Sequence, residues 1–139
     1  MKKIILIMTL SVLSLLNSCF DGLSNTQTRI VRFEAVGSIS NADIYFGTSR
    51  GFAALKSISL PWSSGKISVD FDDDDGGEDP VDCIIRVINN TDDSGFITVR
   101  IYIDGKDVAV NTGFGPHVLV GTGYTIEAKP DYVYNGTID

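Results

Sequence analysis

Carboxylates form the densest group of metal-ligand atoms in this chain. Eight of its eighteen acidic residues fall within residues 70–82, namely Asp70, Asp72, Asp73, Asp74, Asp75, Glu78, Asp79 and Asp82. Ca²⁺ takes about 6–8 oxygen ligands from such segments. An EF-hand loop needs acids at positions one, three and five and a glycine at six, but with Gly76 at six Phe71 falls on position one. Two interpretations stay open: an irregular calcium site on Asp72, Asp73, Asp74 and Asp75, or a solvated loop extended by its own charge.

A single histidine, His117, limits the enzymatic chemistry that the chain could perform. No site with several histidine ligands can form around zinc. A Ser-His-Asp triad would have to use His117, which lies beside an expected strand. The sequence contains no nucleophile elbow and no phosphate-binding glycine loop. The acids gather in one segment, with no apolar pocket indicated that would raise a carboxyl pKa for acid–base catalysis. We therefore expect a non-catalytic protein without a cofactor, and an exposed or edge-strand His117.

Aromatic side chains offer a different chemistry, which is recognition. Tyr45, Trp62 and Tyr102 present flat apolar faces with polar edges and are the candidate ligand contacts. Tyr45 and Tyr102 alternate with apolar residues and are expected on wet faces, Tyr102 together with Arg100. Trp62 alternates with Leu60, so packing in the core is the competing interpretation. A glycan platform on a cell-surface sheet is one function that such residues would serve.

The N-terminus has the pattern of a signal peptide. Lys2 and Lys3 precede a thirteen-residue apolar run at residues 4–16, which is shorter than the roughly 20 residues that span a bilayer. The closing Leu-Asn-Ser-Cys at residues 16–19 resembles the lipobox of bacterial lipoproteins, in which Cys19 would be acylated. Asn17 departs from that pattern, and an ordinary secretory signal cleaved near Ser18 is the alternative. We predict a signal at 1–18, a lipidated N-terminus and flexible tether at 19–28, and one domain at 29–139.

Lipidation of Cys19 would place the protein in the cell envelope, attached to the membrane. Phe20 follows the cysteine where aspartate would favour inner-membrane retention, so we expect the outer membrane of a Gram-negative bacterium. Cys83 would then be the one remaining thiol, without a disulfide partner. Its strand-like surroundings favour a small buried apolar residue over a reactive thiol.

Charge excludes nucleic acid as a partner. The chain has a formal charge of −7 at pH 7, and removal of the signal with its two lysines lowers it to −9. Binding to phosphates requires clustered Lys and Arg, and the sequence shows no such cluster.

From residue 29 onward the apolar residues recur with a period of two, which predicts antiparallel strands with one buried face. The clearest run is 97–103. Asp104-Gly105 predicts a two-residue type I′ hairpin from this run to the next. A loop is expected at 90–95, an acidic loop between 69–71 and 83–88, a continuous run through Ile58, Leu60 and Trp62, and a break at 121–123 between strands 118–120 and 124–128. The sequence predicts an all-β fold, a single antiparallel immunoglobulin-like β-sandwich of seven to nine strands.

Three segments resemble the mycobacterial membrane protein small (MmpS) family. They are Arg32-Phe33-Glu34-Ala35-Val36-Gly37 followed by Ala42-Asp43-Ile44-Tyr45, then Ser59-Leu60-Pro61-Trp62, and Gly95-Phe96-Ile97-Thr98-Val99-Arg100-Ile101-Tyr102-Ile103-Asp104-Gly105-Lys106. The resemblance implies a small immunoglobulin-like sandwich on the outer side of a membrane, an accessory of MmpL-type lipid exporters. That family commonly has a transmembrane helix, and often a cysteine near the position of Val99 with a partner towards the C-terminus, whereas this chain has a lipoprotein-like signal and neither cysteine.

These observations lead to two expectations for function. The first is a non-catalytic envelope lipoprotein, an accessory or interaction protein, with a transporter as the partner that the resemblance implies. The second is a surface module that binds glycan or another envelope ligand.

Overall fold

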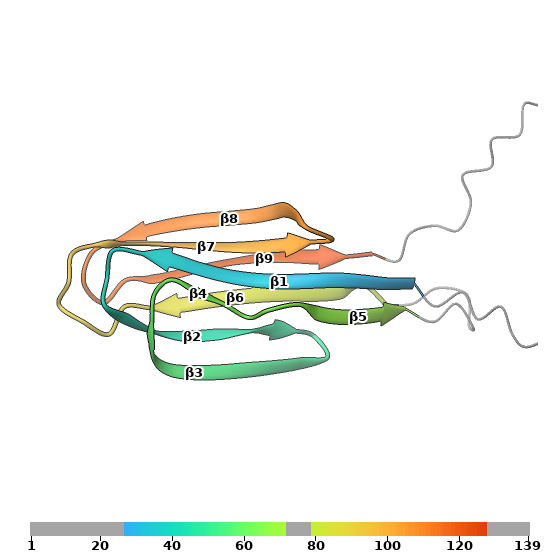
Figure 1. Cartoon of the computed structure of the whole chain (residues 1–139), viewed down its shortest axis with the longest axis horizontal. Coiled ribbons are helices and arrows are strands. Elements are labelled where there is room, and N and C mark those ends of the chain that lie inside the picture. The colour runs from blue at the N-terminus through green and yellow to red at the C-terminus, as the bar shows by residue number, and fades with distance from the viewer. Residues whose placement is uncertain (1–26, 72–78, 128–139) are drawn as a thin grey trace, which may run out of the picture.

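The alternating segments form antiparallel strands in the computed structural model, which describes residues 27–71 and 79–127 (Figure 1). Nine strands lie within these ranges: β1 (Gln27–Gly37), β2 (Asn41–Thr48), β3 (Gly51–Ser59), β4 (Trp62–Ser63), β5 (Ile67–Phe71), β6 (Val81–Ile88), β7 (Phe96–Ile103), β8 (Lys106–Phe114) and β9 (Leu119–Ile126). All of the strand pairings are antiparallel. The all-β prediction is confirmed.

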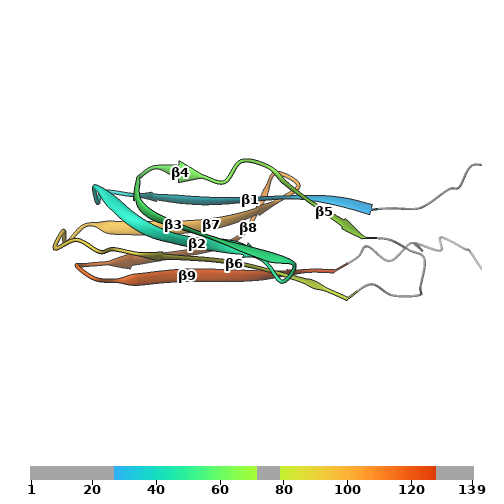
Figure 2. The same ribbon diagram turned by 90° about the horizontal axis from the view of Figure 1, so that it is seen from below.

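The strands form two facing sheets. In the first, called the β1 sheet, β4 and β5 pair in turn with one edge of β1, β7 pairs with its other edge, and β8 follows β7. The second, called the β2 sheet, has the order β3-β2-β6-β9. Figure 2 shows β1 and β4 in one layer and β6 and β9 in the other. The order of the β2 sheet matches that of the C′CFG sheet of immunoglobulin variable domains, with the β7–β8 hairpin inserted before the last strand.

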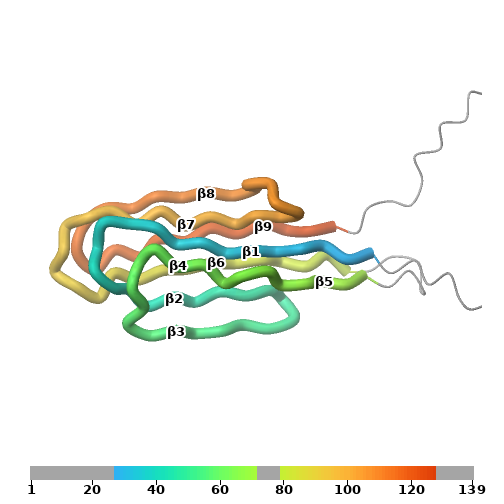
Figure 3. The backbone as a smooth tube through the Cα atoms, in the orientation of Figure 1, coloured from blue at the N-terminus to red at the C-terminus, as the bar shows by residue number. Residues whose placement is uncertain are grey.

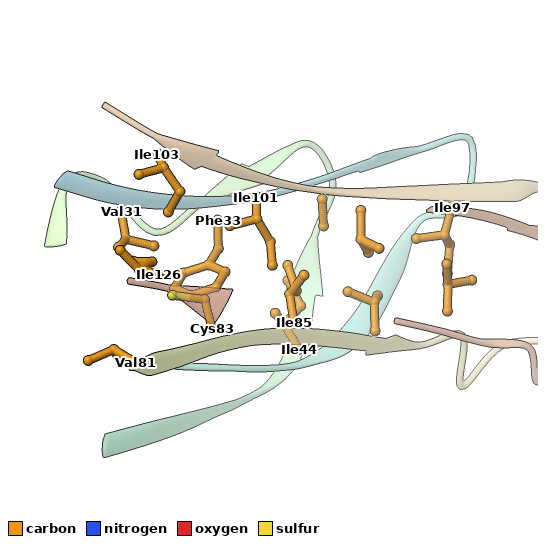
Figure 4. Close-up of a cluster of buried hydrophobic side chains, with 14 of the residues drawn as sticks. Val31, Phe33, Ile44, Val81, Cys83, Ile85, Ile97, Ile101, Ile103 and Ile126 are labelled. Atoms are coloured by element: carbon orange, nitrogen blue, oxygen red, sulfur yellow. The ribbon is translucent and has the colours of Figure 1, made fainter. Parts of the chain in front are cut away.

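The core lies between the two sheets; every second residue along the inner parts of β1, β6 and β7 contributes to it, together with buried residues of β2, β5 and β9 (Figure 4). Phe33, Ile85 and Ile101 have no exposed surface. Complete burial of such a side chain contributes about 1.5–3 kcal/mol. The buried face that the alternation predicts is therefore the inner face of each sheet, and the fold is the predicted sandwich.

The predicted two-residue hairpin is present between β7 and β8. Ile103 pairs with Lys106, and the residues between them have the positive φ angles of a type I′ turn, 51° at Asp104 and 81° at Gly105. The Asp104 carboxylate accepts hydrogen bonds from Arg29 Nε at 2.6 Å and from the Ile30 amide at 2.9 Å. The turn is thus bonded to β1 as well as to its own hairpin.

Two sequence expectations are wrong. β9 runs without a break through residues 121–123, because Gly121 and Gly123 pair with Arg86 and Ile84 of β6 and stay extended in the sheet. The run from Ile58 to Trp62 is not one strand. β3 ends at Ser59, a cis peptide joins Leu60 to Pro61, and Trp62 begins β4 in the opposite sheet.

β1 begins at Gln27, two residues before the expected start of the domain. Gln27 pairs with Phe71 of β5, and the Thr28 hydroxyl donates to the Asp70 carboxylate at 2.6 Å. These polar residues of the expected tether therefore extend the first strand, because β5 is there to pair with them.

The loop between β6 and β7, expected at residues 90–95, is organised by a buried side chain. Asn89 has no exposed surface. Its Nδ2 donates to the carbonyl oxygens of Asp93 at 2.8 Å and Gly115 at 3.0 Å, and its Oδ1 accepts from the amide of Thr91 at 2.9 Å. One asparagine thus holds the β6–β7 and β8–β9 loops together.

Replacement of Gly105 by alanine should destabilise the protein by about 1–2 kcal/mol, the cost of a Cβ at positive φ. Gly51→Ala is the matched control, since no atom lies within 4 Å of a Cβ built there and its φ is not in the left-handed region. Urea unfolding measures both variants. Equal stability of the two variants would contradict the assigned turn.

Candidate functional site

The outer face of the β1 sheet carries polar groups that bond to one another, and beside them the exposed apolar side chains of Phe96, Val110 and Phe114. The Tyr102 hydroxyl donates to Glu34 at 2.9 Å, and the Arg32 guanidinium carbon lies 3.9 Å from the centre of the Tyr102 ring. The hydrogen bond to Tyr102 raises the pKa of Arg100. Among the described residues, Arg100 Nε is the one buried side-chain nitrogen or oxygen without a hydrogen-bond partner. Tyr102 is thus covered by an arginine and engaged by a carboxylate.

The outer face of the β2 sheet has a different composition, because glycines alternate with large side chains on it. Along one row across the sheet, Phe52 of β3 pairs with Gly47, Gly47 with Ile84, and Ile84 with Gly123. Gly47 is required there, since a Cβ would lie 2.2 Å from the carbonyl oxygen of Gly51. Glycine within a strand has no side chain to pack and often marks a place where another group approaches the backbone closely. The large side chains of this face therefore stand beside positions that contribute no side chain.

The next row is built in the same way and carries a charge. Ala54 pairs with Tyr45, Tyr45 with Arg86, and Arg86 with Gly121. The space above Gly121 is occupied by Arg86, whose Cγ would be 3.1 Å from a Cβ on the glycine. The arginine stem therefore lies flat on the sheet between Tyr45 and β9.

Two adjoining hollows result, and together we call them the Arg86 groove. The first has a volume of about 150 Å³ and is lined by Tyr45, Phe52, Ile84 and Arg86. The second, wider one, of about 530 Å³, is lined by Ile84, Arg86, Asn111, Leu119, Gly121, Thr122 and Gly123. Because Ile84 and Arg86 line both, the groove crosses the sheet from β3 to β9.

Arg86 supplies the charge of this groove. No carboxylate of the described residues forms an ion pair with it. A guanidinium presents five N–H donors in a planar fork that matches carboxylate and phosphate groups. In a chain of net charge −7 the groove therefore presents a positively charged group that forms no ion pair among the described residues.

A short polar network fixes Tyr45 at the wall of the groove. Asp43 accepts from Lys56 Nζ at 2.8 Å and from the Ser57 amide at 2.9 Å, and Lys56 Nζ also bonds to the Tyr45 hydroxyl. The bond to Lys56 and then that to the Ser57 amide hold the pKa of Asp43 below its ordinary value, and Asp43 raises the pKa of Lys56. The ammonium group of Lys56 is thus bonded to side chains of its own sheet, whereas the guanidinium of Arg86 forms no ion pair with a described residue.

The structure does not bring the three candidate contact residues into one site. Tyr45 lines the Arg86 groove, whereas Tyr102 lies on the outer face of the opposite sheet. Trp62 is half-buried with its ring centre 4.8 Å from that of Phe46, which in turn lies 5.5 Å from Phe33. Trp62 therefore packs at the margin of the core.

The remaining candidates are placed as follows. His117 is exposed as expected, with Nε2 3.1 Å from Asp92 in the neighbouring loop. Cys83 has no exposed surface and is the predicted buried apolar residue. Cys19 and the segment with Asp72, Asp73, Asp74 and Asp75 lie outside the described residues. Within residues 27–71 and 79–127 no three His, Cys, Asp or Glu side chains gather as a metal site.

The sequence interpretation missed Arg86, Phe52, Ile84 and Leu119. The sequence nevertheless contains a pattern that indicates this face. Gly47, Gly121 and Gly123 lie within strand-like runs, and glycine inside a strand indicates a place where something approaches the backbone closely. Which large side chains border those glycines depends on strand register, so the sequence could not identify them.

Burial makes Cys83 unreactive. Desolvation, together with the charge of Asp82, raises the pKa of this thiol to about 11, so almost none of it is thiolate at pH 8. Iodoacetamide should leave Cys83 unmodified in the folded protein and alkylate it in concentrated urea, as read by peptide mass spectrometry. Alkylation at equal rates in both conditions would contradict the buried position.

The bonds to Asp43 should appear in the pH dependence of stability. A carboxyl whose pKa falls on folding stabilises the protein above its unfolded pKa, which is 3.8 for Asp43, and that contribution is lost as pH falls through the folded pKa. Asp43→Asn should therefore be less stable than the wild type at pH 7 and should lose less stability between about pH 5 and pH 2. Urea unfolding at several pH values measures this, with Asp107→Asn on the other sheet as control. An unchanged pH dependence in Asp43→Asn would contradict the network.

No family model matches the chain, and no curated protein matches it. No helix in the described part of the chain is long and apolar enough to cross a membrane. The residues of the two outer faces and the N-terminal sequence are therefore the features that bear on function.

Proposed function

We propose that this protein is a non-catalytic interaction protein of the cell envelope, tethered by lipid on Cys19, and that it contacts its partner with the outer face of the β2 sheet. The signal-like N-terminus and the lipobox-like Cys19 support the envelope location. Phe20 supports the outer membrane. The resemblance to the MmpS family supports an accessory role in an envelope export complex.

The Arg86 groove carries this proposal. Both outer faces expose apolar side chains, but on the β1 sheet the charged and hydroxyl groups beside them bond to one another across β1, β7 and β8. On the β2 sheet, Phe52 and Leu119, which are 64% and 59% exposed, border the two hollows that Arg86 joins. Contacts in protein interfaces concentrate on aromatic residues and arginine beside pockets. The face with Tyr45, Phe52 and Arg86 has that composition.

Burial of these side chains by a partner would stabilise the complex. Transfer of a phenylalanine or leucine side chain from water to an apolar environment contributes about 1.5–3 kcal/mol each. Arg86 would add a charge-assisted hydrogen bond to an acidic group of the partner, and its guanidinium is not withdrawn from an existing ion pair among the described residues.

Site-specific cross-linking in intact cells tests the proposal. A photo-reactive phenylalanine analogue at Phe52 or Leu119 should capture a discrete envelope protein, identified by mass spectrometry after purification through a C-terminal tag. The same analogue at Thr98 or Thr112, on the outer face of the β1 sheet, should capture much less. The lipid on Cys19 is read from the same sample. Equal capture from both faces, or none from either, would contradict the proposal.

A surface module for an envelope glycan is the second candidate function. Tyr45 favours it, because its ring borders the groove beside Arg86. Soluble peptidoglycan fragments and acidic polysaccharide should then raise the melting temperature, and Tyr45→Phe, which keeps the ring, should preserve more of that rise than Tyr45→Ala. Tyr102→Ala should leave it unchanged, since Tyr102 lies on the other face. A rise that survives Tyr45→Ala would contradict binding at this groove.

A further inference from the structure

β3 is an edge strand with a long unpaired side. Of the described strands it pairs only with β2, and it forms the outermost strand of the molecule on that side (Figure 3). Residues 51–54 are all exposed. Ser57 has a φ of 51°, and the register between β3 and β2 shifts between Ala42 and Ile44. The part of β3 before Ser57 is Gly51–Lys56. Alternate N–H and C=O groups of this stretch face away from β2.

The usual protections of an edge strand are weak along Gly51–Lys56. Natural edges carry proline, outward lysines, inward charges or bulges that prevent pairing with another chain. This stretch has no proline, and its one charged residue, Lys56, has its ammonium group bonded to Asp43 and Tyr45 of β2. The bulge, in which Lys56 and Ser57 lie opposite Asp43, is confined to the end of the stretch, and Phe52 is a largely exposed aromatic residue within the stretch.

The gap between the two sheets is lined by apolar residues next to this edge. β3 of one sheet and β4 and β5 of the other are edges on the same side of the sandwich (Figure 1). Six half-buried apolar side chains come from these strands, from their neighbour β2 and from the β3–β4 connection: Phe46, Leu55, Ile58, Leu60, Trp62 and Ile67. A strand added to β3 would direct every second side chain towards them.

The opposite side of the sandwich is closed instead. β8 and β9, the edges there, approach each other, and Asn111 of β8 donates to the Gly121 carbonyl of β9 at 2.8 Å. β4 has only two residues and β5 only five. Among the described strands, β3 therefore offers the longest edge that lies beside uncovered apolar surface.

Charge indicates the kind of segment that would fit. Between Asp43 and Asp70 the chain contains no acidic residue and three basic ones, Arg50, Lys56 and Lys66, of which Lys56 is already paired with Asp43. The rest of this acidic protein would repel another acidic chain, whereas the segment between Asp43 and Asp70, which includes β3, would not. A second copy of the chain, with its net charge of −7, is a poorer match than a short segment with acidic ends.

We infer that the edge of β3 over Gly51–Lys56 binds an extended segment of a partner polypeptide by strand addition. The segment has apolar residues at alternate positions and an acidic residue at its ends. Backbone hydrogen bonds give affinity in this mode, and the alternate side chains, set against Leu55 and Trp62, give specificity. The inference rests on the proposed function in taking the partner to be a protein.

A synthetic peptide tests this directly. The probe is acetyl-Asp-Val-Thr-Val-Thr-Val-Asp-amide, added to the isotope-labelled mature chain while amide hydrogen exchange is followed by NMR. Slower exchange confined to alternate amides of Gly51–Lys56 is expected. Proline in place of the central valine, or lysine in place of both aspartates, should weaken the effect about tenfold. Ala53→Asp should do the same, because Ala53 is exposed and the new carboxylate would lie at the edge.

Thr112→Asp, an exposed position on β8, is the matched control and should keep the response. No slowing at millimolar peptide, or slowing at β5 or β8, would overturn the inference. A second result would also overturn it: exchange of these amides that is already slow in the free chain and becomes faster in a variant that ends at Glu127. In that case the C-terminal residues of the chain itself would occupy the edge. Slowing that grows with protein concentration would assign the edge to a second copy and overturn it too. If Phe52 cross-links to a partner but the peptide has no effect on exchange, strand addition is refuted and the proposed function is not.

Discussion

The packing of β1, β6 and β7 against one another across the core constrains every other part of this protein. Phe33, Ile85 and Ile101 meet between the two sheets with no exposed surface, and close packing allows no strand to slip by one residue, since a slip would turn its apolar side chains to water. Register is thereby fixed, and with it the identity of the residues that face outward. The composition of the two outer faces is a consequence of this one contact layer.

The two outer faces share this origin but differ in what their strands carry. β1, β7 and β8 place arginines, a glutamate, threonines and Tyr102 opposite one another, so their polar groups are largely satisfied within the face. β2, β6 and β9 place glycines beside Ile84 and Arg86, and β3 adds Phe52 at the margin. Both faces expose apolar side chains, but on the β2 sheet they border hollows and a guanidinium that forms no ion pair among the described residues. We therefore assign recognition to the β2 sheet and its β3 edge.

The errors of sequence interpretation have a common cause. Glycines at 121 and 123 predicted a turn because glycine favours turns locally, but β6 pairs with that stretch along its whole length, and tertiary pairing outweighs local preference. Trp62 was expected to continue the alternation of Ile58 and Leu60, but the chain crosses to the other sheet there. Tyr45 and Tyr102, alike in sequence context, lie on different faces because β2 and β7 belong to different sheets.

The sequence by itself determined the strand content, the buried set and the hairpin at Asp104-Gly105. These are local or periodic properties: alternation is a consequence of strand geometry, and positive φ at two adjacent residues selects Asp and Gly. It also determined the signal-like N-terminus, the single histidine and the clustered acids. Only the tertiary structure decided that Arg86 lies between Tyr45 and Gly121, that Trp62 belongs to the core margin, and that β3 is an edge. Those facts depend on which strands become neighbours, and residues far apart in the chain carry no local mark of that choice.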